Sequence, residues 1–180
     1  MKRNIFIFGS VAGLVFLLFN LALAWLSSKN PGHVGSLFFG YAAMVIAFSF
    51  IFVGVKNYRD KFNQGHVSFG KAFQVGLGIT AIGSTFYVLI WLVNYYGFNP
   101  DFMDKYAAHQ LEVVKASGVS QAVMDKKVAE LNGMKEMYKN PLFVILFTYV
   151  EVLPVGLIIS LLAAWILRRR YPRAEVQVAG

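Results

Sequence analysis

Residues 141–167 read PLFVILFTYVEVLPVGLIISLLAAWIL, and this stretch decides the fold. Glu151 is its single charged residue. A helix rises about 1.5 Å per residue, so a helix of this length extends about 40 Å, while the hydrocarbon core of a bilayer is about 30 Å thick. A core helix of a soluble protein is usually shorter and has a polar face. The stretch therefore predicts a transmembrane helix.

Three further apolar stretches occupy residues 4–26, 36–55 and 72–96, and the first two contain no charged residue. The whole chain of 180 residues is 57% hydrophobic and only 14% charged. A soluble domain carries about 25% charged residues, and so short a chain has too little interior for this many apolar side chains. We predict an all-α integral membrane protein, a four-helix transmembrane bundle forming one domain over 1–173, with a tail at 174–180.

Residues 99–139 form the only sizeable polar part of the chain. Asp101 and Asp104 fall in the first turn of a helical pattern, where acidic groups favour the helix dipole. Ser117-Gly118 interrupts this pattern, and apolar residues return at helical spacing over 120–139. We expect a two-helix hairpin between spans three and four, packed on the bundle or lying at headgroup level.

Two Asn-Pro pairs mark helix starts. Asn can cap a helix N-terminus, and Pro suits the first helical position because its missing N–H is not needed there. Asn140-Pro141 predicts the start of the fourth span, and Asn99-Pro100 predicts the start of the hairpin.

Lysine and arginine counts predict the orientation. The N-terminus, the second loop and the C-terminus carry ten basic residues, whereas the first loop has only Lys29. The third loop holds six Lys, but they are spread over a long segment that also holds six acids, and the rule weakens for long loops. We expect both termini in the cytoplasm and the hairpin exported. The ten basic residues are Lys2, Arg3, Lys56, Arg59, Lys61, Lys71, Arg168, Arg169, Arg170 and Arg173.

Two alternatives accompany this topology. The first span has a basic start and an Ala22-Leu23-Ala24 pattern typical of signal-peptide cleavage, but its apolar run exceeds a signal core of 7–15 residues, so we expect an anchor. The basic rim sets the orientation, or it also binds anionic lipid at about 1 kcal/mol per residue. Nucleic-acid binding is not expected, because no binding fold accompanies the charge. The rim residues considered are Lys56, Arg59, Lys61, Arg168, Arg169 and Arg170.

Glu151 is the candidate functional residue. It lies about 15 Å into its span, where a charge costs on the order of 3 kcal/mol. It must face the bundle interior, pair with a polar group, or stay protonated. Pro154 follows and leaves the Val150 carbonyl without its usual donor. The pair fits interhelical hydrogen bonding, or else a proton relay or hinge. The partners expected from depth are Ser84, Thr85 and Tyr87 on the third span and Asn20 on the first.

Small residues recur at four-residue spacing on three spans, a pattern that allows close helix approach. We interpret it as packing within one chain, with homodimerisation as the alternative. The residues are Gly9 and Gly13 on the first span, Gly76, Thr80 and Ser84 on the third, and Gly156 and Ser160 on the fourth.

The chain offers little for catalysis. His33, His66 and His109 lie in three different loops, and zinc usually needs three or four protein ligands. Ser68-x-x-Lys71 matches a penicillin-binding-enzyme pattern by letters but lacks the companion motifs. We therefore expect no metal, no cofactor and no catalytic residues, and we lean toward a protein that is not an enzyme.

Several motifs together resemble a bacterial membrane family catalogued as domain of unknown function 4199. The resemblance covers about residues 5–170 and implies a four-span protein of the bacterial inner membrane, without implying any activity. The motifs are FVGVKNYRDK at 52–61, GHVSFGKAF at 65–73, NPDF at 99–102, NP at 140–141 and PVGLI at 154–158.

Two functions follow as hypotheses. The first is a non-enzymatic scaffold or partner of other envelope proteins, associating with another membrane protein or as a homo-oligomer in the lipid bilayer. The alternative is a small-solute or proton-coupled carrier that uses Glu151.

Overall fold

The computed structural model describes residues 1–29 and 37–169, and this part of the chain is almost entirely helical. Arg170, Arg173, His33 and the predicted tail at 174–180 lie outside it. The elements are α1 (Lys2–Lys29), α2 (Leu37–Asn57), the π-helix η1 (Tyr58–Phe62), α3 (Phe69–Val93), the π-helix η2 (Asn94–Phe98), α4 (Phe102–Ala116), α5 (Gln121–Tyr138) and α6 (Pro141–Leu167).

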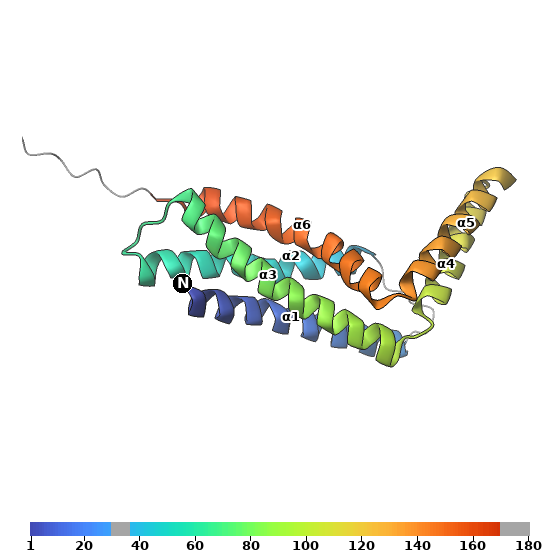
Figure 1. Cartoon of the computed structure of the whole chain (residues 1–180), viewed down its shortest axis with the longest axis horizontal. Coiled ribbons are helices and arrows are strands. Elements are labelled where there is room, and N and C mark those ends of the chain that lie inside the picture. Colours follow the sequence, from blue (N-terminus) through green and yellow to red (C-terminus); the bar gives the residue numbers. More distant parts are fainter. Residues whose placement is uncertain (30–36, 170–180) are drawn as a thin grey trace, which may run out of the picture.

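Four helices are long and apolar enough to cross a membrane. The spans lie lengthwise beside one another (Figure 1), which confirms the prediction of a four-span helical membrane protein. They are Lys2–Leu26 in α1, Phe39–Phe62 in α2 and η1, Phe69–Phe98 in α3 and η2, and Pro141–Leu167 in α6.

The second and third helical segments run further than the apolar pattern predicts. The second continues through η1 to Phe62, beyond the expected end at residue 55. The third begins at Phe69, because the Ser68 hydroxyl accepts a hydrogen bond from the Lys71 backbone N–H at 3.3 Å. Hydropathy predicts the apolar length of a helix, whereas hydrogen bonding decides at which residue the helix ends. A prediction from hydropathy therefore assigns charged residues at a helix end to a loop.

The two Asn-Pro predictions have different outcomes. Asn140 caps α6 as predicted, since its side-chain oxygen accepts from the Leu142 N–H at 3.0 Å. The prediction for Asn99 is wrong, because α4 begins only at Phe102. The Asn99 side chain instead donates to Asn94 Oδ1 at 2.7 Å and ties the loop back to η2.

Helix α3 is the central element and packs against α1, α2 and α6. The fully buried side chains of the bundle include Met44, Phe48 and Ile51 of α2 and Val75 and Ile79 of α3. Lipid tails are as apolar as these side chains, so close packing and interhelical hydrogen bonds hold the spans together.

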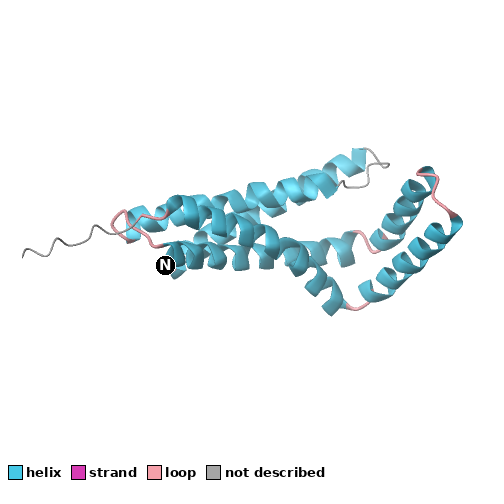
Figure 2. Cartoon of the chain, turned by 90° about the horizontal axis from the view of Figure 1, so that it is seen from above, coloured by secondary structure: helices cyan, strands magenta, loops and turns pink. Residues whose placement is uncertain are grey.

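Helices α4 and α5 form an antiparallel hairpin at one end of the bundle and lean away from its axis (Figure 1, Figure 2). An aromatic cluster holds its base. Trp91 meets Phe102 edge to face at 4.9 Å between ring centroids, and Tyr95 meets Tyr138 at 5.7 Å. Lys135 and Asp104 form an ion pair that joins the two helices.

The opposite end of the bundle gathers the start of α1, the segment after α2 and the end of α6 (Figure 1). The Asn4 side chain donates to the Gly54 carbonyl at 2.9 Å. Val67 and Arg169 form an antiparallel bridge with two backbone hydrogen bonds of 3.0 and 2.9 Å. Eight of the fifteen Lys and Arg residues that the structure describes lie at this end, where Asp60 is the one described acid.

Candidate functional site

Glu151 lies on the outer surface of α6, at about the middle of the span. Its side chain is exposed and forms no hydrogen bond or ion pair with any described residue. Val150 beside it is 70% exposed. Of the three states expected for this carboxyl group, burial in the bundle interior is therefore excluded, and pairing is excluded within residues 1–29 and 37–169.

The partners predicted from depth bond elsewhere. Thr85 donates to the Ala81 carbonyl at 2.9 Å and lies 3.0 Å from the Tyr149 hydroxyl. The Asn20 side-chain oxygen accepts from Asn94 at 3.2 Å. Residues 149 and 151 of one helix are about 200° apart, so matched depth does not mean a matched face.

Ser84 has a different outcome. Its side chain is fully buried on α3, and its hydroxyl has no hydrogen-bond partner among the described residues. A buried hydroxyl without a partner costs roughly 1–3 kcal/mol. Ser84 thus contributes a small side chain to the helix contact but no bond to Glu151.

Two tyrosines share the electrostatic surroundings of Glu151. Its charge acts on Tyr87, which lies inside the bundle, and on Tyr138, the last residue of α5. Burial and, after it, the charge of Glu151 raise the pKa of the Tyr138 phenol above its ordinary value. The carboxyl group therefore lies within electrostatic range of the hairpin base. The sequence contains no signal of this proximity, since the two residues belong to different helices.

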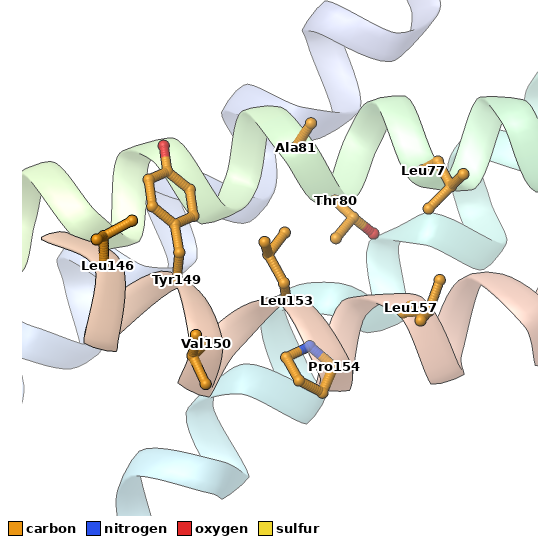
Figure 3. A pocket seen from close by; sticks show the side chains of 9 residues that line it. All are labelled: Leu77, Thr80, Ala81, Leu146, Tyr149, Val150, Leu153, Pro154 and Leu157. Atoms are coloured by element: carbon orange, nitrogen blue, oxygen red, sulfur yellow. The ribbon is translucent and has the colours of Figure 1, made fainter.

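An apolar groove runs between α3 and α6 next to Pro154 (Figure 3). Its volume is about 790 Å³, and its polar side chains are already paired. Thr80 bonds to Ser160 at 3.0 Å, and Tyr149 bonds to Thr85. Glu151 does not line the groove. The groove therefore suits hydrocarbon rather than a polar substrate. It is lined by Leu77, Thr80, Ala81, Leu146, Tyr149, Val150, Leu153, Pro154 and Leu157.

The small residues of α3 and α6 face each other. A Cβ added at Gly76 would lie 2.9 Å from Cβ of Ser160, and one added at Gly156 would collide with the Thr80 side chain. Both glycines allow α3 and α6 to approach closely, and the buried Thr80–Ser160 hydrogen bond forms at this contact.

The glycines of α1 face α3 in the same manner. A Cβ at Gly9 would lie 2.6 Å from Cβ of Ile82, and one at Gly13 would lie 2.5 Å from the Phe86 ring. The small-residue positions of α1, α3 and α6 thus lie in contacts within one chain.

At the basic end of the bundle, the buried Arg59 forms an ion pair with the exposed Asp60. Arg59 is 8% exposed, its Nε donates to Asp60 Oδ1 at 2.6 Å, and Nη1 donates to the Leu167 carbonyl at 3.4 Å. Lys56, Lys61 and Arg168 are exposed. Arg59 therefore holds η1 against the end of α6. The sequence pattern does not distinguish this role from that of the neighbouring basic residues.

No cluster of three or more His, Cys, Asp and Glu that could hold a metal ion occurs in the part of the chain that the structure describes. His66 and His109 lie in different segments, after η1 and in α4. The chemistry available around Glu151 is therefore that of a carboxyl group near phenols in an apolar setting.

The comparisons with known proteins agree with this description. The model of the family described as protein of unknown function (DUF4199) matches residues 7–169, nearly the whole chain. Neither the curated proteins nor the solved structures give a match. The motifs of the sequence, the four spans and this match lead to one conclusion: the chain is a four-span helical membrane protein that belongs to the DUF4199 family.

Proposed function

We propose that this protein is a non-enzymatic component of the bacterial inner membrane that binds another membrane protein through the Glu151 face of α6. The partner is a transmembrane helix with a basic side chain or a hydrogen-bond donor near mid-membrane. The carboxyl group of Glu151 supports this proposal, because it is exposed and has no partner among the residues that the structure describes.

A charge in this position costs on the order of 3 kcal/mol, and lipid tails offer it no hydrogen bond. Interhelical hydrogen bonds in membranes contribute about 0.6 kcal/mol on average, so a neutral partner offsets little. A cationic partner offsets more, because the bond is then charge-assisted. The exposed apolar residues Val150 and Ile158 supply packing area beside the carboxyl group.

The proposed orientation places both termini in the cytoplasm and the α4–α5 hairpin outside. It is supported by the basic residues at one end of the bundle and by the balanced charge of residues 99–139, with six Lys and six acids. The positive-inside rule connects the first feature to the cytoplasm.

The chain has no cysteine, which permits a clean test of orientation. Single Lys126→Cys and Lys61→Cys variants are treated with a membrane-impermeant maleimide in spheroplasts. We expect labelling at position 126 alone, and labelling at position 61 only after lysis. Labelling of position 61 in intact spheroplasts contradicts the orientation.

The test of function combines affinity purification in mild detergent with three variants. We expect a stoichiometric membrane protein to co-purify with wild type, less with Glu151→Gln and not with Glu151→Leu. Glu112→Gln removes an exposed carboxyl group in the hairpin and should retain the partner. In addition, replacing the intramembrane polar residue of the captured protein should break the complex.

Capture that is unchanged in Glu151→Leu contradicts the proposal. Recovery of a second copy of this chain alone would replace the hetero-partner with a homo-oligomer.

The carrier remains the second candidate because Tyr87 and Tyr138 lie within electrostatic range of Glu151. It is tested with purified protein in liposomes that contain a pH-sensitive dye, under a potassium diffusion potential. A proton flux that is present in wild type and Glu112→Gln but lost in Glu151→Gln would favour the carrier. The partner-binding proposal expects no flux above that of empty liposomes.

A further inference from the structure

We infer that the end of the bundle opposite the hairpin holds a binding site for the phosphate group of an anionic lipid, with Lys56 and Arg169 as its principal ligands. Lys61 and Arg168 flank it. These four cations are called the basic corner below.

Three segments converge to form the basic corner. Lys56 lies in the last turn of α2, and Lys61 lies in η1. Arg169 follows α6, and its backbone is fixed to Val67 by the two hydrogen bonds of the antiparallel bridge. The cations on different segments are therefore held at fixed positions by the fold, so they are not simply a charged tail.

Asp60, the acidic residue near the basic corner, is already paired with Arg59. Asp60 receives Arg59 Nε at 2.6 Å and Nη2 at 3.2 Å, so both carboxylate oxygens bind one guanidinium group. Lys56 and Arg169 lie close enough to act electrostatically on Asp60, but neither forms an ion pair with it or with another residue that the structure describes. Within residues 1–29 and 37–169, the corner thus has a local excess of positive charge with no unpaired acid to neutralise it.

The position of the basic corner along the bundle favours the phosphate of a lipid over free phosphate as its ligand. Lys56 is the last residue but one of α2, and Arg169 follows the end of α6 at Leu167, so both cations lie toward the end of the spans that is opposite the hairpin, near the membrane surface. Lipid phosphates are concentrated at this level. A lipid can also place its acyl chains along the exposed apolar residues of α6, such as Trp165 and Ile166, which a free phosphate cannot do.

The experiment uses the full chain in detergent and measures lipid binding by native mass spectrometry. The probes are phosphatidylglycerol, phosphatidylcholine and inorganic phosphate. We expect wild type to retain phosphatidylglycerol in preference to phosphatidylcholine. The double variant Lys56→Gln/Arg169→Gln should bind it about 25-fold more weakly, from about fivefold for each charge, which corresponds to about 1 kcal/mol.

Two control variants make the result specific. Lys115→Gln/Lys126→Gln removes the same charge from the hairpin and should bind like wild type. Lys56→Arg/Arg169→Lys keeps the charge and should also bind; it stands in if the neutral variant does not fold.

Three results would overturn the inference: equal loss in the hairpin variant, unchanged binding in the neutral variant, or competition by inorganic phosphate at the concentration of the lipid.

Discussion

At the scale of residues, glycine and hydroxyl groups determine how closely the spans approach. Gly76 and Gly156 leave room for Ser160 and Thr80, and the 3.0 Å hydrogen bond between those two hydroxyls forms in the buried contact. In a bilayer, the hydrophobic effect does not drive helices together. The stability lost with such a close contact is therefore not regained by burying apolar surface elsewhere.

Gly156→Ala should destabilise the bundle because the new Cβ collides with Thr80. Overpacking of this kind costs about 1–3 kcal/mol. Gly133→Ala is the matched control, since a Cβ at Gly133 meets nothing within 4 Å, and there alanine should be neutral or stabilise the helix by up to about 1 kcal/mol. Unfolding in mixed detergent and SDS micelles measures both. Equal stability of the two variants would show that the α3–α6 contact is not close in the membrane.

Residue-scale features also mark the limit of prediction from sequence. The depth of Glu151 and the cap at Asn140 follow from position along the chain. The direction in which Glu151 points depends on the rotation of α6 against its neighbours, and one residue changes that direction by about 100°. Thr85 accordingly meets Tyr149 instead of Glu151.

At the scale of elements, the second and third spans end at different residues from those that their apolar patterns predict. α2 continues into η1 and α3 into η2, and π-turns of this kind are often found at functional sites. The number of spans and the two helices of the hairpin could be predicted because apolar length and helical periodicity are local properties. The π-turns could not be predicted, since they depend on contacts such as Arg59 with Leu167 and Asn94 with Asn99.

Phe102→Ala should loosen the hairpin while leaving the bundle intact. Phe102 joins α4 to Trp91 and Tyr95, and an aromatic pair contributes about 0.5–1.5 kcal/mol beyond burial. Amide hydrogen exchange in α4 and α5 should therefore accelerate about twofold to tenfold, with α3 and α6 unchanged. Phe98→Ala, at a side chain 77% exposed, should change neither region. Exchange that accelerates equally in all helices would instead indicate that the hairpin and the spans unfold together.

At the scale of the whole molecule, charge is segregated along the long axis. Among the residues that the structure describes, the end with the start of α1 and the end of α6 holds eight Lys and Arg residues and one acid, Asp60, while the hairpin end holds seven Lys and six acids. The composition alone raises the possibility of nucleic-acid binding, but this distribution fits orientation in a membrane and contact with anionic lipid. Glu151 is the charged residue in the middle of the spans that neither role explains.

The most direct test of the central claim is photo-crosslinking in intact membranes from p-benzoylphenylalanine at Val150, next to Glu151. The same probe at Leu18, 57% exposed on α1, is the control. We predict a discrete protein adduct from position 150 that disappears when Glu151→Leu is added, and no such adduct from position 18. Crosslinks to lipid alone from position 150, or the same adduct from both positions, would contradict a partner on the Glu151 face.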